Sequence, residues 1–308
     1  MTNYNFSSKF RYANIFSATL FFLSIILITF KGLNYGIDFK GGTLIELRSN
    51  NTEASSIRDI LKNMELGDVN VKKFGKEGDF LIKVEQKGDN NKLIPEIKKN
   101  LSDNLNSDIN FRRVENVGPK VSAELLQSGI LAISLSLAAM LFYIWIRFEW
   151  QFSVGSIIAL FHDVIITIGI FSLLSLEINL SIIAAVLTIV GYSMNDTVVI
   201  YDRIRENLGK FHKLNISDIA NLSINETLAR TIITSVTTLL ALLSIFILGG
   251  EILRGFSFAM ILGVLIGTYS SIFVASPILK YFKVSYKTIE KEEDKIVPWI
   301  NKGFGLLP

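Results

Sequence analysis

The sequence predicts a membrane protein with six transmembrane α-helices and one ferredoxin-like α+β domain between helices 1 and 2. Half of its 308 residues are hydrophobic and only 19% are charged, against about 25% charged in ordinary soluble domains. The apolar residues lie in long runs that can each cross a hydrocarbon layer of about 30 Å. Residues 32–122 contain no such run and carry many charges. We therefore expect one water-exposed domain and six membrane spans.

The first apolar run predicts an uncleaved transmembrane helix over residues 12–31. Tyr12 to Phe30 form 19 uncharged residues, with Lys9 and Arg11 before them and Lys31 after them. This run is too long for the apolar part of a signal peptide, and no small-residue cleavage site follows it. We expect residues 1–11 to lie in the cytoplasm.

Residues 32–122 predict an α+β domain. Thr43, Ile45 and Leu47 alternate with Leu44, Glu46 and Arg48, which is typical of a half-buried strand. Helical spacing of apolar residues follows, and the glycines at 75 and 78 predict a hairpin turn. The resulting order β-α-β-β-α-β is that of the ferredoxin-like fold. The expected strands are 42–48, 68–74, 80–86 and 109–116, and the expected helices are 53–64 and 92–105.

Residues 123–281 predict transmembrane helices 2–6, and residues 282–308 a cytoplasmic tail. The expected spans are 125–146, 152–174, 180–201, 231–248 and 256–279. Lysines and arginines concentrate in the connection 202–230 and in the tail, whereas the two short connections on the other side hold only Arg254. The positive-inside rule then places both termini in the cytoplasm and the 32–122 domain outside.

Small residues predict close helix packing in two spans. Ala259, Gly263, Gly267, Ser271 and Ala275 follow one another at intervals of four residues, and small side chains let membrane helices approach closely. In the fourth span a second set shares one face: Ser181, Ala184, Thr188, Gly191 and Asn195. Six spans need not cover every such face, so we also expect a partner subunit.

Few ionisable residues lie within the spans, and Asp196 is the main candidate. A carboxylate at membrane depth costs about 2.5–3.5 kcal/mol on insertion scales, so such residues mark functional sites. Arg230 immediately precedes the fifth span, at a similar level, and can reach inward along its stem. An Asp196–Arg230 pair is either a structural ion pair or a proton switch, in which burial favours the neutral acid and arginine the carboxylate. Asn195 and Thr197 can supply hydrogen bonds.

His162 and Asp163 lie in the middle of the third span. As adjacent residues on a helix they point about 100° apart, so we expect them to meet different neighbours. A helix-stabilising hydrogen-bond network is the first interpretation, and a supporting role in proton relay is the second.

Several other classes of site have no support in the sequence. The chain has no cysteine and two histidines, which argues against a metal site. The segment Gly36 to Gly42 (GIDFKGG) lacks both phosphate-binding glycine patterns, so we interpret it as a rigid turn between the first span and the outer domain. No catalytic triad or paired-glutamate arrangement is present, and the net charge of +3 says little about nucleic acid. We expect no enzyme activity, no cofactor and no nucleic-acid partner.

Nearly the whole chain, from about Arg11 to Tyr281, resembles the SecF family of bacterial preprotein translocase subunits, in the SecD/SecF family of the resistance–nodulation–division superfamily. The resemblance depends on 36–42, on His162-Asp163, on 191–207 and on the segment 226–231 (ETLART). It implies a proton-coupled accessory subunit in the inner membrane, with its 32–122 domain in the periplasm. The family's transmembrane aspartate and arginine then correspond to Asp196 and Arg230.

The resemblance also implies partners. These are SecD, the SecYEG channel, YajC and YidC, unfolded preprotein and the lipid bilayer, and SecD supplies a further acid to the proton path. Two alternatives remain open at this point. One is a stand-alone proton-driven exporter of small or lipidic compounds, for which a domain of about 90 residues is small. The other is a scaffold whose membrane charges are purely structural.

Overall fold

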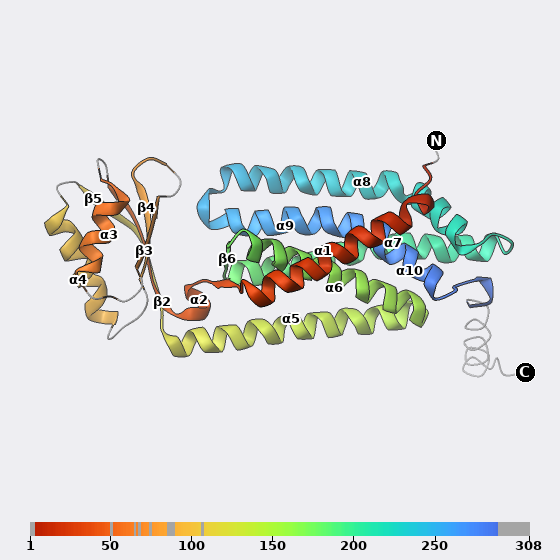
Figure 1. The fold of residues 1–308 in the computed structure, drawn as a ribbon, viewed down its shortest axis with the longest axis horizontal. Helices are drawn as coiled ribbons and strands as arrows, with labels where there is room; N and C mark the ends of the chain where they lie inside the picture. The colour runs from red at the N-terminus through yellow and green to blue at the C-terminus, as the bar shows by residue number, and fades with distance from the viewer. Residues whose placement is uncertain are drawn as a thin grey trace, which may run out of the picture.

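The computed structural model describes residues 4–49, 52–64, 66, 69–73, 76–84, 90–105 and 108–288. It has an α+β domain at one end of a long helical bundle (Figure 1). We call the end of the bundle nearest this domain the outer end, and the opposite end the inner end. Six helices of the described chain are long and apolar enough to cross a membrane. The predicted fold class is confirmed.

The outer domain has the predicted order of elements, each within a few residues of its expected bounds. Its four strands form an antiparallel sheet in the order β3-β4-β2-β5, which is the ferredoxin-like arrangement with the first and third strands in the centre. The expected ends of two strands, at 68, 74 and 85–86, lie outside the described residues. The elements are β2 (Gly42–Ser49), α3 (Ala54–Lys62), β3 (Val69–Lys73), β4 (Asp79–Val84), α4 (Asn90–Asn104) and β5 (Ile109–Val117).

Helices α3 and α4 cover the face of the sheet that points away from the bundle (Figure 1). Ile45, Leu47, Phe80 and Ile82 alternate along the two central strands and are fully or almost fully buried beneath these helices. The residues that alternate with these four along the strands face the bundle. They include Arg48 and Asp79, which form an ion pair at 2.6 Å. The sheet is therefore apolar on its helix-covered face and charged on its bundle-facing side.

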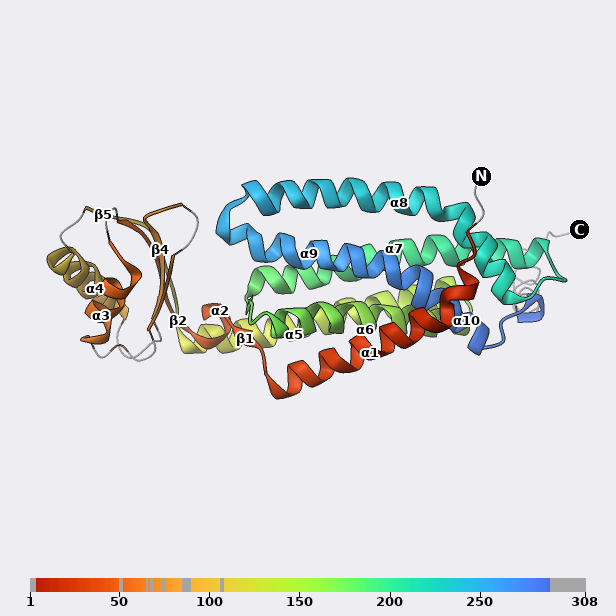
Figure 2. The same cartoon turned by 45° about the horizontal axis from the view of Figure 1, so that its top comes forward.

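A short segment, residues 34–42, joins the first membrane helix to the sheet, and we call it the outer connector. It contains β1 (Asn34–Tyr35), the single-turn helix α2 (Ile37–Lys40) and the start of β2. Strand β1 pairs in parallel with β6 (Glu177–Ile178), which lies between the third and fourth membrane helices. The predicted rigid turn is thus a structured connector that contacts a distant part of the chain (Figure 2).

Three helices lie in the interior of the bundle and three lie at its periphery. About half of the residues in the most apolar parts of α6, α7 and the last span are buried, against fewer than a fifth in α1, α5 and α8. A 3₁₀ turn at Ser7–Lys9 precedes α1. The long helices are α1 (Phe10–Phe30), α5 (Pro119–Arg147), α6 (Trp150–Leu173), α7 (Leu180–Lys210) and α8 (Ile216–Leu248), and the last span consists of α9 (Gly250–Ser270), a π-helical turn (Ser271–Ala275) and α10 (Ser276–Tyr281).

The connection expected over residues 202–230 is mostly helical, which corrects the sequence-based prediction. Helix α7 continues to Lys210 and α8 begins at Ile216, so the true connection is only 211–215. Charged residues at helical spacing stabilise the extension, because Glu206 pairs with both Arg203 and Lys210. Charge marks where this helix leaves the apolar region, but not where it ends.

The predicted ridge of small residues packs against α7. A β-carbon on Gly263 would lie 2.2 Å from a side-chain carbon of Ile189, and one on Gly267 would lie 2.9 Å from Ser193 Cβ. Both glycines are therefore required for the close approach of α7 and α9. Ala259, Ser271 and Ala275 on the same ridge are fully buried.

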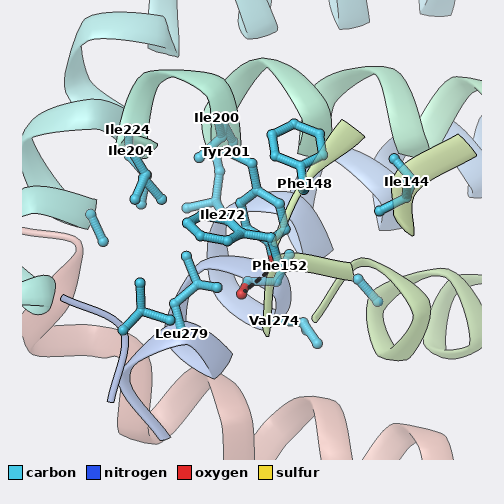
Figure 3. Packing of buried hydrophobic residues seen from close by; sticks show 14 of the residues in the cluster. Ile144, Phe148, Phe152, Ile200, Tyr201, Ile204, Ile224, Ile272, Val274 and Leu279 are labelled. Atoms are coloured by element: carbon cyan, nitrogen blue, oxygen red, sulfur yellow. Dashed lines mark hydrogen bonds between the residues drawn. The ribbon is translucent and has the colours of Figure 1, made fainter. Parts of the chain in front are cut away.

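In the inner half of the bundle, aromatic and branched side chains pack into a cluster around Tyr201 (Figure 3). The Tyr201 ring meets Phe152 edge-on, with ring centroids 5.1 Å apart. Its hydroxyl donates a hydrogen bond of 2.9 Å to the carbonyl of Ala275 (Figure 3). This carbonyl is the last one of the π-helical turn, two residues before Pro277.

Candidate functional site

Asp196 lies on α7 in the interior of the bundle and is only 3% exposed. Thr268 of α9 donates a hydrogen bond of 3.4 Å to its carboxylate, and Thr268 also contacts Ser235 of α8 at 2.7 Å. Three helices thus meet at this acid. It lies about 24 Å from the start of α7 at 1.5 Å per residue, which places it deep within the span.

Arg230 makes no ion pair with Asp196 within 4.0 Å in the described structure. The arginine is on the exposed side of α8, although it is near enough to act electrostatically on the carboxylate. Asn195 is also exposed, so it does not contribute a hydrogen bond toward the interior. The structure brings the two charged groups into the same region without joining them directly.

Thr197 does point inward. It is 2% exposed, and its hydroxyl contacts Ser271 Oγ at 2.9 Å. Ser271 begins the π-helical turn, a feature that frequently occurs at functional sites. Thr197 therefore connects the helix that carries Asp196 to the irregular turn of the last span.

His162 and Asp163 form a second buried polar cluster on α6. Asp163 is fully buried and accepts hydrogen bonds from Ser193 Oγ of α7 (2.5 Å) and Ser270 Oγ of α9 (2.7 Å). Its other oxygen lies 2.8 Å from His162 Nδ1. The two residues meet different neighbours as expected, because Asp163 contacts the serines while the His162 ring stacks on Tyr269. In addition, the histidine side chain folds back onto the adjacent carboxylate.

Sequence reasoning missed the hydroxyl groups that surround both acids. Ser193, Ser235, Thr268 and Ser270 are ordinary residues for a membrane span, and nothing in their spacing marks them individually. One signal was present, because Ser271 belongs to the ridge of small residues, where a serine provides both a small volume and a hydrogen bond. The ridge is therefore also a polar surface between α7 and the last span.

The chemistry of the arrangement is that of acids held in a bundle, not of a catalytic centre. Within the described residues no group of three or more metal-ligating side chains occurs. Asp196 lies among hydroxyl groups, and Asp163 contacts two serine hydroxyls and the His162 ring. His162 Nε2 is buried and has no hydrogen-bond partner in the described structure.

Two family comparisons cover most of the chain. The family described as "Protein export membrane protein SecD/SecF, C-terminal" matches residues 97–285, and the "SecD/SecF GG Motif" matches residues 26–53. The chain belongs to the SecD/SecF family. The first match contains Asp196, Arg230 and the His162-Asp163 pair, and the second contains the outer connector.

Within this family the chain is similar to SecF proteins. It is 47% identical to the protein translocase subunit SecF of Rickettsia bellii over 283 residues, which cover 91% of this chain and 93% of that protein. It is 46% identical to SecF of Rickettsia rickettsii over 295 residues, covering 94% and 96%. The predicted SecF resemblance is confirmed.

Solved SecDF structures have the same fold. The translocon-associated membrane protein SecDF from Thermus is 38% identical, with a TM-score of 0.83 over 92% of this chain. A SecDF structure in a super-membrane-facing form is 36% identical, with a TM-score of 0.69 over 96% of this chain. The chain spans about two fifths of each SecDF chain, 39% and 40%.

Proposed function

We propose that the chain is the SecF subunit of a SecDF complex that uses the proton motive force to assist protein translocation through the Sec channel. The main observation behind this proposal is the burial of Asp196. It is an acid buried inside a lipid-embedded bundle, with hydroxyl groups and no ion pair among the described residues to compensate it. Buried acids of this kind mark proton pathways in transporters.

The energy available is adequate for such a role. One proton that crosses about 100 mV releases about 2.3 kcal/mol, and about 1.4 kcal/mol changes a two-state ratio tenfold. Protonation of Asp196 would change its interaction with Thr268 on α9 and with the nearby Arg230. Thr197, Asp163 and His162 support this site, since all three contribute to the polar contacts between α6, α7 and the last span.

A second subunit completes the site in this proposal. Ala184, Thr188, Gly191 and Asn195 lie on one face of α7 and are exposed in the single chain. This face of small and polar residues suits close packing against another membrane helix. Arg230, on the adjacent α8, is also exposed. We assign this face to SecD, which would then contribute groups next to Asp196 and Arg230.

The orientation of the chain follows from its charges. The start of α1 and the end of α10 both lie at the inner end of the bundle (Figure 1). Arg147, Arg203, Lys210 and Lys280 also lie at that end, at the close of their helices. The positive-inside rule then places this end in the cytoplasm and the outer domain in the periplasm of a bacterial inner membrane.

The remaining partners belong to the same proposal. The outer domain would assist unfolded preprotein as it leaves SecYEG, and YajC and YidC would associate through the exposed helices. A stand-alone exporter would need an apolar passage through its outer domain, whose interior is filled by packed side chains such as Ile45, Leu47 and Ile82.

Asp196→Asn tests the proton coupling. The amide keeps the shape of the side chain and removes its charge, so the gradient-dependent part of preprotein export should be lost. Asp202→Asn is the matched control, because Asp202 is on the same helix but is exposed at the inner end, where it pairs with Arg147. Export that still responds fully to the gradient in Asp196→Asn would contradict the proposal.

Purification tests the assembly. A complex with a second six-span protein supports the SecDF proposal, whereas a homomeric assembly favours the exporter. If Asp196→Asn prevents assembly and leaves the activity of the assembled fraction unchanged, the acid is structural and the scaffold interpretation holds.

A further inference from the structure

The outer connector attaches the outer domain to α7, although the chain enters it from α1. Strand β1 pairs with β6, so that Asn34 lies beside Glu177 and Tyr35 beside Ile178. The backbone N–H of Gly36 then donates a hydrogen bond of 2.8 Å to the carbonyl of Ile178. Residues 177–178 lead directly into α7, which begins at Leu180. The connector therefore holds the segment from which α7 starts.

Asp38 makes the contact with α7 itself. Its carboxylate accepts a hydrogen bond of 2.9 Å from the backbone N–H of Leu180, the first residue of α7. A carboxylate at this position satisfies an N–H group that has no partner within the helix and lies favourably in the helix dipole. Next to it, Phe39 is buried in the same apolar cluster as Ile182 and Ile189 of α7. The connector is thus fixed to α7 by a polar and an apolar contact.

On its other side the connector is continuous with the centre of the sheet. Gly41 and Gly42 have φ angles of +80° and +133°, which favour glycine. A β-carbon on Gly42 would also lie 2.6 Å from the carbonyl oxygen of Val84 on the neighbouring strand. The chain therefore passes within one residue from α2 into β2, a central strand of the sheet.

A second contact joins the sheet to the start of α7. Lys83 of β4, on the bundle-facing side, forms an ion pair with Glu177 of β6. Away from the Asp38–Leu180 and Lys83–Glu177 contacts, part of the sheet is separated from the bundle. A cavity of about 510 Å³ separates Leu44 and Leu81 of the sheet from Phe246 and Phe258 of the bundle. The connector also packs against the start of α5, where Ser122 Oγ donates a hydrogen bond of 3.4 Å to the Ile37 carbonyl. The contacts between the two domains therefore lie near the starts of α5 and α7.

We propose that Asp38 and the Lys83–Glu177 pair are coupling contacts, through which the outer domain moves together with α7. This inference depends on the proposed function, because α7 is the helix that carries Asp196. Helix α7 is continuous from Leu180 to Lys210, so a shift or rotation caused at Asp196 reaches its outer end. There Asp38 transfers the displacement to β2, and Lys83 transfers it to β4.

A chemical cross-link tests whether the sheet and α7 move as one body. The chain has no cysteine, so the double variant K83C/E177C can be joined selectively with a short, cleavable bis-thiosulfonate reagent. We expect the cross-linked complex to retain gradient-dependent export within about two-fold of the protein without substitutions. Export that is lost on cross-linking and returns on cleavage would show that the sheet and the start of α7 must separate during export, and would overturn the proposal. K83C treated with the same reagent is the control.

A distance measurement tests Asp38 independently of export. Spin labels at S56C on α3 and L248C at the outer end of α8 report the position of the outer domain relative to the bundle, since both sites are exposed. We expect Asp38→Ala to broaden the distance distribution and Asp38→Asn to leave it narrow, because an amide oxygen also accepts the Leu180 N–H. Asp103→Ala, at an exposed acid of the same domain, should have no effect.

Export measured on the same variants separates this inference from the proposed function. We expect Asp38→Ala to reduce the gradient-dependent part of export at least five-fold and to leave the gradient-independent part unchanged. Lys83→Met removes only the ion pair with Glu177 and leaves the Asp38–Leu180 contact in place. It should reduce gradient-dependent export less than Asp38→Ala does. An unchanged distance distribution in Asp38→Ala, or a broadened one with full gradient-dependent export, would overturn the coupling role. Failure of the proposed function would instead appear as full gradient response in Asp196→Asn.

Discussion

The outer domain and the membrane bundle place polar residues in opposite positions. The interior of the outer domain is formed by apolar side chains such as Ile45, Leu47 and Ile82, and the Arg48–Asp79 ion pair lies on the bundle-facing side of the sheet. The interior of the bundle contains Asp163 and Asp196 with hydroxyl groups around them, and many of its large apolar side chains are exposed. The outer domain buries apolar groups, which water solvates poorly, and the bundle buries polar groups, which lipid solvates poorly.

This difference shows that two different interactions specify the two domains. Burial of apolar surface drives folding in water, but lipid is as apolar as the side chains that face it. Membrane helices therefore associate through close backbone approach and hydrogen bonds between helices. Polar groups buried for this purpose are also available for proton transfer, so in the bundle the same contacts serve packing and function.

The largest expected effect tests close packing in the bundle. In Gly263→Val the added carbons occupy the space of the Ile189 side chain, whose Cγ1, Cδ1 and Cγ2 lie 2.2–2.8 Å from the position that a β-carbon would take. Overpacking costs about 1–3 kcal/mol and sometimes more, so thermal unfolding of the purified complex should occur at a clearly lower temperature. Gly209→Val on α7 is the control, because no atom lies within 4 Å of its β-carbon position. Equal stability of both variants would mean that packing at the ridge does not specify the bundle.

A somewhat smaller effect concerns the hydrogen bond to Asp196. Thr268→Val keeps the shape of the side chain and removes its contacts with Asp196 and Ser235. Loss of a hydrogen bond of about 1 kcal/mol should reduce gradient-dependent export about five-fold, as measured in membrane vesicles. Thr268→Ser should restore it. Thr237→Val on α8 removes only bonds to backbone carbonyls and should leave export unchanged. A similar loss in both valine variants would attribute the effect to helix packing.

The outer domain should respond to acid through Asp79. Its hydrogen bond with Arg48 lowers the pKa of this carboxyl below its usual value. Stability from this contact is therefore fully present above about pH 4 and is lost as the pH falls through the lowered pKa of the folded state. Asp79→Asn should be less stable at pH 7 and should lose less stability between pH 5 and pH 2. Hydrogen exchange of β2 and β4 amides measures this, with Asp103→Asn as the exposed control, and equal acid sensitivity in all three proteins would contradict the prediction.

The smallest expected effect compares two tyrosines on α7. Tyr201→Phe removes the hydroxyl that donates to the Ala275 carbonyl of the π-helical turn and should lower the free energy of unfolding by about 1 kcal/mol. The hydroxyl of Tyr192 is buried and has no hydrogen-bond partner in the described part of the chain. Tyr192→Phe should therefore be neutral or slightly stabilising in the same denaturation experiment. A loss of stability in Tyr192→Phe would contradict the prediction, because it would mean that the buried hydroxyl has a hydrogen-bond partner.

The sequence predicted the fold well because its signals are local. A run of 19 uncharged residues must span, and the alternation along residues 43–48 specifies which side of β2 is buried. The ridge through Gly263 and Gly267 was also visible, because a repeat of four residues needs no knowledge of the partner helix. The end of α7 was missed, since a charged helical extension and a charged loop have the same composition.

The site was predicted only in part because it depends on contacts between helices. Asp196 stands out in the sequence as an acid in an apolar run. Thr268, Ser193 and Ser270 become recognisable only when α7 and the last span pack together. The role of Asp38 was missed for the same reason, since Leu180 lies 142 residues away along the chain.

The outer domain leaves and re-enters the bundle at a single point. Gly42, where the sheet begins, is paired directly with Val117, where it ends, so their α-carbons lie about 5 Å apart. A chain from which residues 43–116 are removed could be rejoined there by a very short linker, without displacing α2 or α5. We therefore expect that the domain can be exchanged or deleted as a unit while the helices remain in place.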